Sequence, residues 1–262
     1  MKLIRSLLLS LALVAPAIAG AAELRNLVPG NVEAFHYSWR LRGGLSWIAG
    51  LVFPRSGVGA LTTTFPDGER TTISSELLIT SPGEGTNAFY LYQSQMDASG
   101  SKTLMTYHGY AWGNRSRKER TVFDYVRRLA HTHKETPTKV EDKVRPLPDI
   151  QLRDVLTAIY FLRQNADTIQ APLTTTIYSD GKQYPVVFRR AGQATFTIGG
   201  DRVPASAFEV VGAPGGERKW PGGVTVWISD DARRIPCRIE IAETLVSLQL
   251  DLQSVESYSL LK

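Results

Sequence analysis

The chain has 262 residues, 43% of them hydrophobic, and a formal net charge of +5. This length allows one large domain or two small ones. The charge is too mild for a dedicated nucleic-acid-binding protein, so we expect no nucleic-acid partner. No stretch approaches the ~20 consecutive apolar residues of a membrane-spanning helix, so we predict no membrane span.

The first 22 residues have the features of a secretory signal peptide. Lys2 and Arg5 make its start positive, residues 7–14 form a short apolar core, and Ala17 and Ala19 frame a small-x-small cleavage site. The apolar core is too short to cross a membrane. The sequence therefore predicts export to a bacterial periplasm.

Cleavage after Ala19 is our first prediction and cleavage after Ala22 our second. The mature chain, residues 23–262, then forms one β domain with a net charge of about +3. The residue directly after the predicted cleavage site is not a cysteine, so we expect no lipid anchor. Cys237 is the only cysteine, so an intramolecular disulfide is excluded. We expect Cys237 to be a small buried hydrophobic residue on a strand.

Most of the mature chain alternates apolar and polar residues with a period of two, which is typical of half-buried strands. Phe35, Tyr37, Trp39 and Leu41 form the first aromatic face. In the first half, further strands are expected at 45–53, 59–65, 71–80, 88–92 and 103–112. In the second half they are expected at 173–178, 183–190, 194–198, 205–211, 224–228, 235–241, 244–252 and 255–261. Short strands at this spacing predict a barrel or a sandwich.

Segment 115–145 differs, because it holds ten Lys or Arg and five Asp or Glu. We predict a strand that runs into a long polar loop through Pro137 and Pro146, with the charges on a solvated face. The alternative is a basic mouth for an anionic head group or an envelope surface. His131 and His133 would share one face of a strand, but without a third ligand we predict no metal site.

One helix is predicted, from about Asp149 to Arg163. Asp149 is a good N-cap, and Asp154 is the alternative. The apolar residues that fall on one helical face are Leu152, Val155, Leu156, Ile159 and Leu162. A lone helix with so wide an apolar face must bury it against the sheet, at the open end or on one face of a curved β structure.

Three stretches resemble the DUF3108 family. The chain from Trp227 to Ile239 reads W-I-S-D-D-A-R-R-I-P-C-R-I, which resembles that family's hairpin signature. The stretch from Asp154 to Arg163 resembles its helix motif. Residues 180–184, D-G-K-Q-Y, resemble its D-G-K-x-Y hairpin.

This resemblance implies an exported bacterial protein without assigned catalytic residues. It also implies a fold similar to that of the LolA/LolB lipoprotein carriers. We therefore expect a mainly β protein with minor α: a strongly curved antiparallel sheet, or incomplete barrel, with one main helix covering the concave face.

The first functional hypothesis is a periplasmic, non-catalytic binding protein for a hydrophobic or amphipathic ligand, such as a lipid or an acyl chain. A half-open β structure with an apolar interior can hold such a ligand. The candidate ligand-binding residues are Trp39, Trp47, Tyr160, Trp227, and two residues that could pair with an anionic head group, Arg163 and Arg233. The alternative for each is structural, because the helix could fill the interior and each arginine could form a surface ion pair.

The second hypothesis is a structural or interaction module of the cell envelope. An exposed sheet edge or segment 115–145 would then bind a protein or cell-wall partner.

An enzyme is the third hypothesis, and the sequence argues against it. It contains no G-x-S-x-G, no H-E-x-x-H and no P-loop. Asp230 and Asp231 are adjacent, so their carboxylates would tend to point apart rather than form an acid–base pair. We predict no catalytic residues, no metal and no cofactor.

Overall fold

The structure is a computed structural model, and it describes residues 31–43, 54–66, 71–81, 88–113, 115–147, 151–179, 181–215, 220, 222–242 and 247–258. Three predictions lie outside these residues: the signal peptide, the strand at 45–53 that contains Trp47, and the N-cap at Asp149.

The described chain forms fourteen strands and one helix. Strands β1 to β8 are Val32–Arg42, Ser56–Thr64, Ile73–Ser81, Ala88–Met96, Thr103–Trp112, Arg115–Asp124, Leu129–Thr136 and Lys139–Pro146. Strands β9 to β14 are Leu173–Ser179, Lys182–Ile198, Asp201–Gly212, Gly223–Ser229, Pro236–Ala242 and Ser247–Tyr258, and helix α2 is Val155–Asn165.

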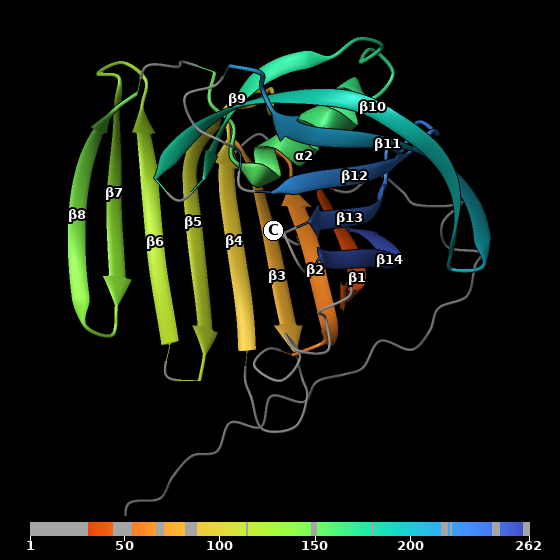
Figure 1. The fold of residues 1–262 in the computed structure, drawn as a ribbon, viewed down its shortest axis with the longest axis horizontal. Coiled ribbons are helices and arrows are strands. Elements are labelled where there is room, and N and C mark those ends of the chain that lie inside the picture. Colours follow the sequence, from red (N-terminus) through yellow and green to blue (C-terminus); the bar gives the residue numbers. More distant parts are fainter. Residues whose placement is uncertain are drawn as a thin grey trace, which may run out of the picture.

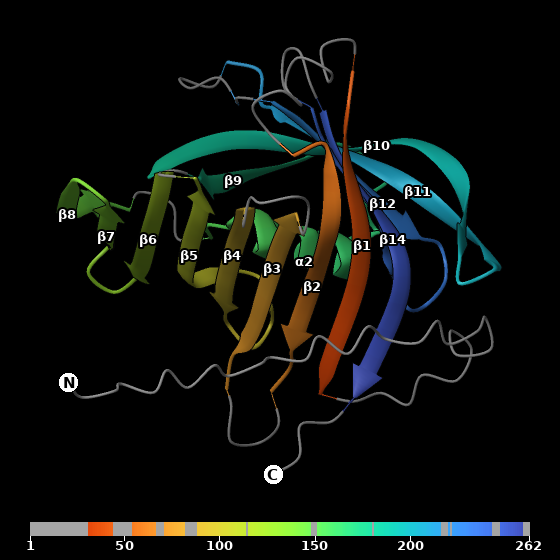
Figure 2. The ribbon, with the colours of Figure 1, turned by 90° about the horizontal axis from the view of Figure 1, so that it is seen from below.

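All fourteen strands belong to one antiparallel sheet, in the order β8-β7-β6-β5-β4-β3-β2-β1-β14-β13-β12-β11-β10-β9. Strands β2 to β8 form a wall, and β9 to β13 pass in front of it (Figure 1). Seen from below, α2 lies between the two layers (Figure 2). The predicted fold class, a mainly β curved sheet that forms an incomplete barrel around one helix, is confirmed. The helix is not long and apolar enough to span a membrane, and it is the only one in the described chain.

Helix α2 starts later than our first prediction, because the residues before it are extended. The Arg153 N–H donates to the Thr176 carbonyl at 3.2 Å, and the Tyr178 N–H donates to the Arg153 carbonyl at 2.7 Å. Asp154 is the N-cap, and its side chain accepts a 2.8 Å hydrogen bond from the Thr157 N–H. The alternative cap named from the sequence is therefore the one found.

The first turn of α2 is fastened to the wall by buried hydroxyl groups. Thr157 Oγ1 lies 3.0 Å from Ser94 Oγ and 2.8 Å from Thr103 Oγ1. Thr103 Oγ1 also accepts the Asp154 N–H at 2.8 Å. These bonds satisfy most polar groups at a helix terminus that is shielded from water, and Asp154 Oδ2 is a buried atom without a hydrogen-bond partner among the described residues.

The main core lies between α2 and the sheet. From the helix, Leu156, Ile159 and Leu162 are buried, and Phe161 lies 6.1 Å from Phe188 of β10, centroid to centroid. Burying a leucine-sized side chain contributes roughly 1.5–3 kcal/mol. Tertiary packing therefore holds this helix of only 11 residues, since isolated helices of that length are marginal.

Strand β9 and the turn after it contact the β6–β8 end of the sheet through side chains of β6 and β8, and the two edge strands, β8 and β9, are not paired with each other. The Phe123 and Tyr178 rings meet edge to face at 4.9 Å, and the Arg145 guanidinium donates to the Gly181 carbonyl. Leu147 and Leu152 complete a second, smaller core at this seam.

Segment 115–145 was wrongly predicted to be mostly loop. It forms β6, β7 and β8, and only short turns connect them. In β6, buried Glu119, Thr121 and Phe123 alternate with exposed residues. Two of these three inward residues are polar. The strand therefore lacks the alternation of apolar and polar residues by which the other strands were predicted.

Two pairs of predicted strands are single strands with irregularities. Residues 183–190 and 194–198 both belong to β10, which has a bulge between Arg190 and Gly192. Residues 244–252 and 255–261 overlap one strand, β14, whose pairing with β1 shifts register opposite His36 and Tyr37.

Candidate ligand-binding pocket

The second half of the sheet presents a different set of residues on each face. Directly opposite residues of an antiparallel pair point to the same side. One row runs Phe208, Val226, Ile239, Leu250, Trp39 across five strands. It lies on the α2 side, because Phe35, which is four residues before Trp39 on β1 and therefore on the same face, packs with its ring centroid 4.8 Å from the Arg163 guanidinium of α2.

The neighbouring row lies on the opposite face. It runs Ala207, Trp227, Arg238, Asp251, Ser38 across the same five strands. Successive residues of a strand point to opposite faces. Trp227 and Trp39 therefore lie on opposite sides of the sheet.

Because of its bulge, strand β10 directs one aromatic side chain to each face of the sheet. Before the bulge, Phe188 is opposite Val210 and packs toward α2; after it, Phe196 is opposite Val203, in line with Ala207. A single extra residue reverses which positions face inward and increases the local bend. The end of the β10–β11 hairpin curls over the side of β14 away from α2 (Figure 2).

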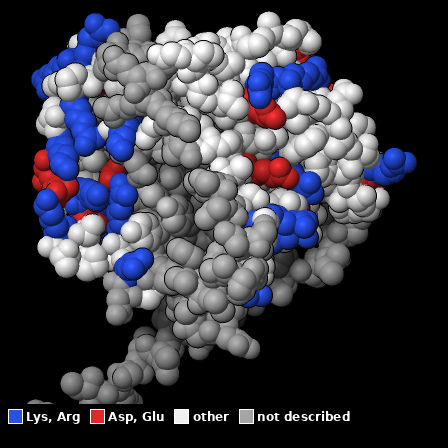
Figure 3. Space-filling model, viewed as in Figure 1, with Lys and Arg blue, Asp and Glu red and all other residues white. Residues whose placement is uncertain are grey.

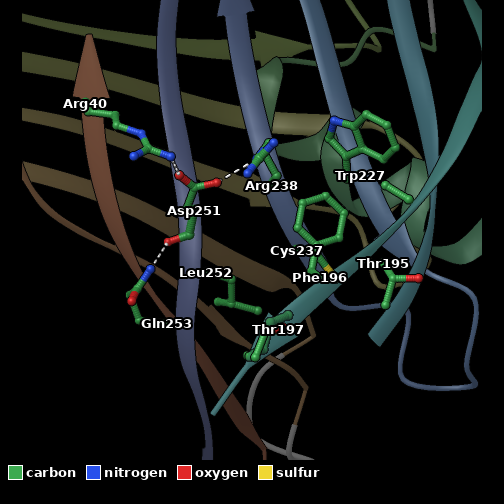
Figure 4. A pocket seen from close by; sticks show the side chains of 12 residues that line it. Arg40, Thr195, Phe196, Thr197, Trp227, Cys237, Arg238, Asp251, Leu252 and Gln253 are labelled. Carbon is green, nitrogen blue, oxygen red and sulfur yellow. Dashed lines mark hydrogen bonds and ion pairs between the residues drawn. The ribbon is translucent and has the colours of Figure 1, made fainter. Parts of the chain in front are cut away.

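This curl borders an open cavity of about 500 Å³, called here the hairpin pocket (Figure 4). Its lining residues are Arg40, Ala194, Thr195, Phe196, Thr197, Ile198, Trp227, Cys237, Arg238, Asp251, Leu252 and Gln253. The volume falls within the range of about 300–1,000 Å³ that is typical of small-molecule sites.

One wall of the hairpin pocket is aromatic. The Phe196 and Trp227 rings meet edge to face, with centroids 5.5 Å apart. The Trp227 indole Nε1 is buried and has no hydrogen-bond partner in the part of the chain that the structure describes. A buried donor without a partner is costly.

The opposite wall is polar and ordered around one carboxylate. Asp251 accepts hydrogen bonds from Arg238 at 2.6 Å, from Gln249 at 2.6 Å and from Arg40 at 3.0 Å. The Arg238 guanidinium also lies 4.9 Å from the Phe196 ring centroid, which joins the two walls. Among the residues that line the cavity, this wall therefore holds two guanidinium groups and one carboxylate; Arg238 also lies 3.6 Å from the carboxylate of Glu240, which is outside the lining.

Cys237 contributes an apolar atom to the pocket rather than a reactive one. Its side chain is 1% exposed, and its Sγ lies 3.4 Å from the Ile235 carbonyl. Burial, assisted by the nearby Asp231 carboxylate, raises the pKa of the thiol to about 12. The group therefore stays protonated near neutral pH, as expected for a buried cysteine.

The turn after Trp227 is held by its own polar side chains. Ser229 Oγ donates to Asp231 at 2.8 Å and accepts the Ile235 N–H at 2.7 Å. Asp231 also accepts bonds from the Arg233 N–H and Nε at 3.1 and 2.9 Å. Although burial alone would raise it, these bonds from Arg233 and Ser229 keep the pKa of Asp231 below its usual value. The turn residues thus perform a structural task.

Residues 53–253 match the family described as "Protein of unknown function (DUF3108)". The chain belongs to the DUF3108 family. The S-D-D turn, the helix from Asp154 and the hairpin at Gly181, which suggested this family from the sequence, all lie within the matched range. No curated protein matches the chain.

The fold of this DUF3108 chain is similar to a solved structure from Brucella abortus. That structure is described as a beta-barrel-like protein of the domain of unknown function DUF1849. The TM-score is 0.57 at 9% sequence identity, with 88% of this chain and 99% of the other covered. At this identity the likeness concerns the fold alone.

The structure places two of the predicted site residues on the α2 side. Trp39 is 7% exposed, and its Nε1 donates to the Thr80 carbonyl at 2.9 Å. Tyr160 is half-buried, lies 6.0 Å from Phe65 between centroids, and covers Gly100 so closely that a Cβ there would come within 2.2 Å of its ring. Both side chains therefore take part in packing around the helix.

The two predicted arginines lie at the end of α2 and in the DUF3108 turn. Arg163 is 8% exposed; it pairs with Glu33 at 2.9 Å and donates to the Arg234 carbonyl at 2.8 Å. Arg233 pairs with Asp231 in the turn itself. Of the predicted residues that the structure describes, only Trp227 lines the hairpin pocket.

Sequence reasoning missed four residues of the pocket walls: Phe196, Arg40, Arg238 and Asp251. Arg238 belongs to the family motif, which was a usable signal. The others come from three strands far apart in the sequence, and only the strand order and the β10 bulge bring them together. The described residues contain no group of three or more His, Cys, Asp or Glu arranged to hold a metal ion.

Proposed function

We propose that this DUF3108 protein is a non-catalytic, periplasmic binding protein for an amphipathic ligand such as a lipid or acyl chain. The ligand occupies the hairpin pocket. Its apolar part lies against Phe196 and Trp227, and its polar head faces Arg40 and Arg238.

The observation that carries this proposal is the pairing of an aromatic wall with a cationic wall in one cavity of about 500 Å³. Ligand sites are usually mostly apolar with a few convergent polar groups. The Asp251 carboxylate holds both guanidinium groups in place before binding. An anionic head therefore meets an ordered cationic wall, which reduces the entropic cost of binding.

Two further features support binding rather than catalysis. The thiol of Cys237 is protonated, and Asp251 is fully engaged by three donors. Neither group is placed to act as a nucleophile or a general base. The periplasmic location follows from the predicted signal peptide.

The test is native mass spectrometry of the mature protein, purified gently from the periplasm, followed by organic extraction and lipid analysis. We expect a stoichiometric apolar or amphipathic ligand that raises the melting temperature when it is added back to the stripped protein.

Two variants locate the ligand. Trp227→Ala should abolish co-purification, whereas Tyr160→Ala, which removes a half-buried aromatic ring on the other face, should retain it. A clean apo mass for the wild type, with no stabilisation by fatty acids or phospholipids, would contradict the proposal.

A further inference from the structure

Strands β6 to β8 sort their charges by face. Ser94, Thr106, Thr121, Thr132 and Lys143 lie directly opposite one another from β4 to β8. Ser94 bonds to Thr157 of α2, so this row lies on the helix side of the wall. Every second residue of each strand shares that side.

The helix side of these strands is strongly basic. It carries the following charged residues, called here the basic shelf: Arg115, Arg117, Glu119, Lys134, Lys139, Glu141, Lys143 and Arg145. The outer side carries a different set: Lys118, Arg120, Asp124, Glu135 and Asp142. The shelf therefore has six basic and two acidic residues, whereas the outer side has two basic and three acidic residues. The positive charge is therefore concentrated on one surface.

Ion pairs within the shelf leave this excess in place. Arg117 pairs with Glu119 at 2.5 Å, while Lys139 and Lys143 share the single carboxylate of Glu141. Hydrogen bonds from these two lysines lower the pKa of Glu141 to about 2, so it remains an anion at any physiological pH. One carboxylate between two ammonium groups still leaves a positive site.

Part of the shelf is open to solvent. The side chains of Lys139 and Lys143 are 66% and 48% exposed. Lys and Arg gather over β6 to β8 at the left of the molecule (Figure 3). The other end of the same strands is closed, because Tyr178 of β9 packs on Phe123.

An aromatic row adjoins the shelf. Tyr90 of β4 and Tyr110 of β5 stack with centroids 5.6 Å apart, and Tyr110 is directly opposite Arg117. Tyr90 is 41% exposed. A tyrosine offers an apolar ring and a polar hydroxyl together, and a sugar offers the matching C–H faces and hydroxyl groups.

We propose that the basic shelf binds an anionic polysaccharide, a sugar chain that carries carboxylate groups. The lysines would pair with its carboxylates, Glu141 would accept hydrogen bonds from its hydroxyls, and Tyr90 would lie against a sugar ring. Carboxylates within the shelf disfavour a polyanion that has no hydroxyl groups to donate to them. This site is separate from the hairpin pocket and does not depend on the ligand proposed there.

The experiment measures binding of fluorescently labelled polygalacturonate to the mature protein by anisotropy, with neutral dextran as the negative control. Lys134→Gln with Lys143→Gln removes two charges from the shelf. Lys118→Gln with Arg120→Gln removes two charges from the outer side of the same strands, so both variants have the same net charge.

We expect the shelf variant to bind roughly tenfold or more weakly than the wild type, and the outer variant to bind within about twofold of it. Binding should also weaken as salt rises. Equal losses in the two variants would show an effect of net charge alone. Absence of wild-type binding, or stronger binding to phosphatidylglycerol vesicles than to polygalacturonate, would overturn the proposal.

Discussion

The space under α2 and the space under the β10–β11 curl are walled by the same strands on opposite faces. The first is filled by Leu156, Ile159 and Leu162 of the helix. The second has no helix, and a cavity of about 500 Å³ remains. A curved sheet therefore does not by itself create a binding site, and the interior of this one serves as core.

The helix side of the sheet also differs along its length. Near β1 it is aromatic and buried, and at β6 to β8 it is charged and partly exposed. The helix covers only the first part, since its nearest strands are β3, β4 and β9. Beyond the part that α2 covers, the same face of the sheet is exposed to solvent.

The largest effect is expected when a core side chain of α2 is shortened. Leu162→Ala removes a fully buried side chain and should lower the free energy of unfolding by roughly 2–5 kcal/mol. Leu173→Ala is the matched control, because Leu173 is 38% exposed and should cost less than about 1 kcal/mol. Urea denaturation measures both changes, and equal losses would contradict a packed interior under α2.

Arg163 tests whether the end of α2 is anchored or free to bind a ligand. Arg163→Met keeps the stem but removes the donors to Glu33 and the Arg234 carbonyl. We expect a loss of about 1.5–3 kcal/mol in the free energy of unfolding. Arg189→Met, which breaks an exposed pair with Glu209, should cost at most about 1 kcal/mol. A neutral effect of Arg163→Met would favour the ligand-binding role instead.

Trp227 should matter more for binding than for stability. Its side chain is only partly buried, so Trp227→Ala should cost about 1–2 kcal/mol of unfolding free energy. Its removal should nevertheless abolish ligand-dependent stabilisation in a thermal-shift titration. A loss of 3 kcal/mol or more, typical of a core aromatic, would reassign this residue to the core.

Substitution of Asp154 should have the smallest effect on the free energy of unfolding, and this effect should depend on pH. Burial raises the pKa of this N-cap carboxyl above its ordinary value of 3.8, partly offset by the hydrogen bond from Thr157. A raised folded-state pKa stabilises the fold while the group is protonated, and that contribution is lost as pH rises through it.

Asn caps equally well without titrating. The stability of Asp154→Asn relative to the wild type should therefore increase from about pH 3 to about pH 7. Asp154→Ala should instead lose about 1 kcal/mol because the cap is gone. A difference between Asn and wild type that does not change with pH would contradict the raised pKa.

The sequence was informative wherever local pattern decides the structure. Strict alternation identified β1, β12 and β13, and the acidic residue before Val155 identified one of two caps. The faces of β10 could not be predicted, because the bulge after Arg190 reverses the alternation without leaving a sign in the residue types. The pairing of β1 with β14 joins the two ends of the described chain, and no local pattern contains that information.

The candidate site was predicted least well for the same reason. Trp39 and Trp227 look equivalent on paper, since each is an aromatic residue in an alternating strand. Their separation onto two faces depends on the register of three strand pairs. The basic shelf was hidden in a similar way, because its charges separate only when alternate residues of three strands are assigned to the correct side.

The central claim is that the ligand lies on the Trp227 face and not on the Trp39 face. The most direct measurement is quenching of tryptophan fluorescence by a dibrominated fatty acid, which requires contact with the indole. Quenching of the wild type should be saturable, should disappear in Trp227→Phe, and should persist in Trp39→Phe. Quenching that persists in Trp227→Phe and disappears in Trp39→Phe would place the ligand under α2 and contradict this account.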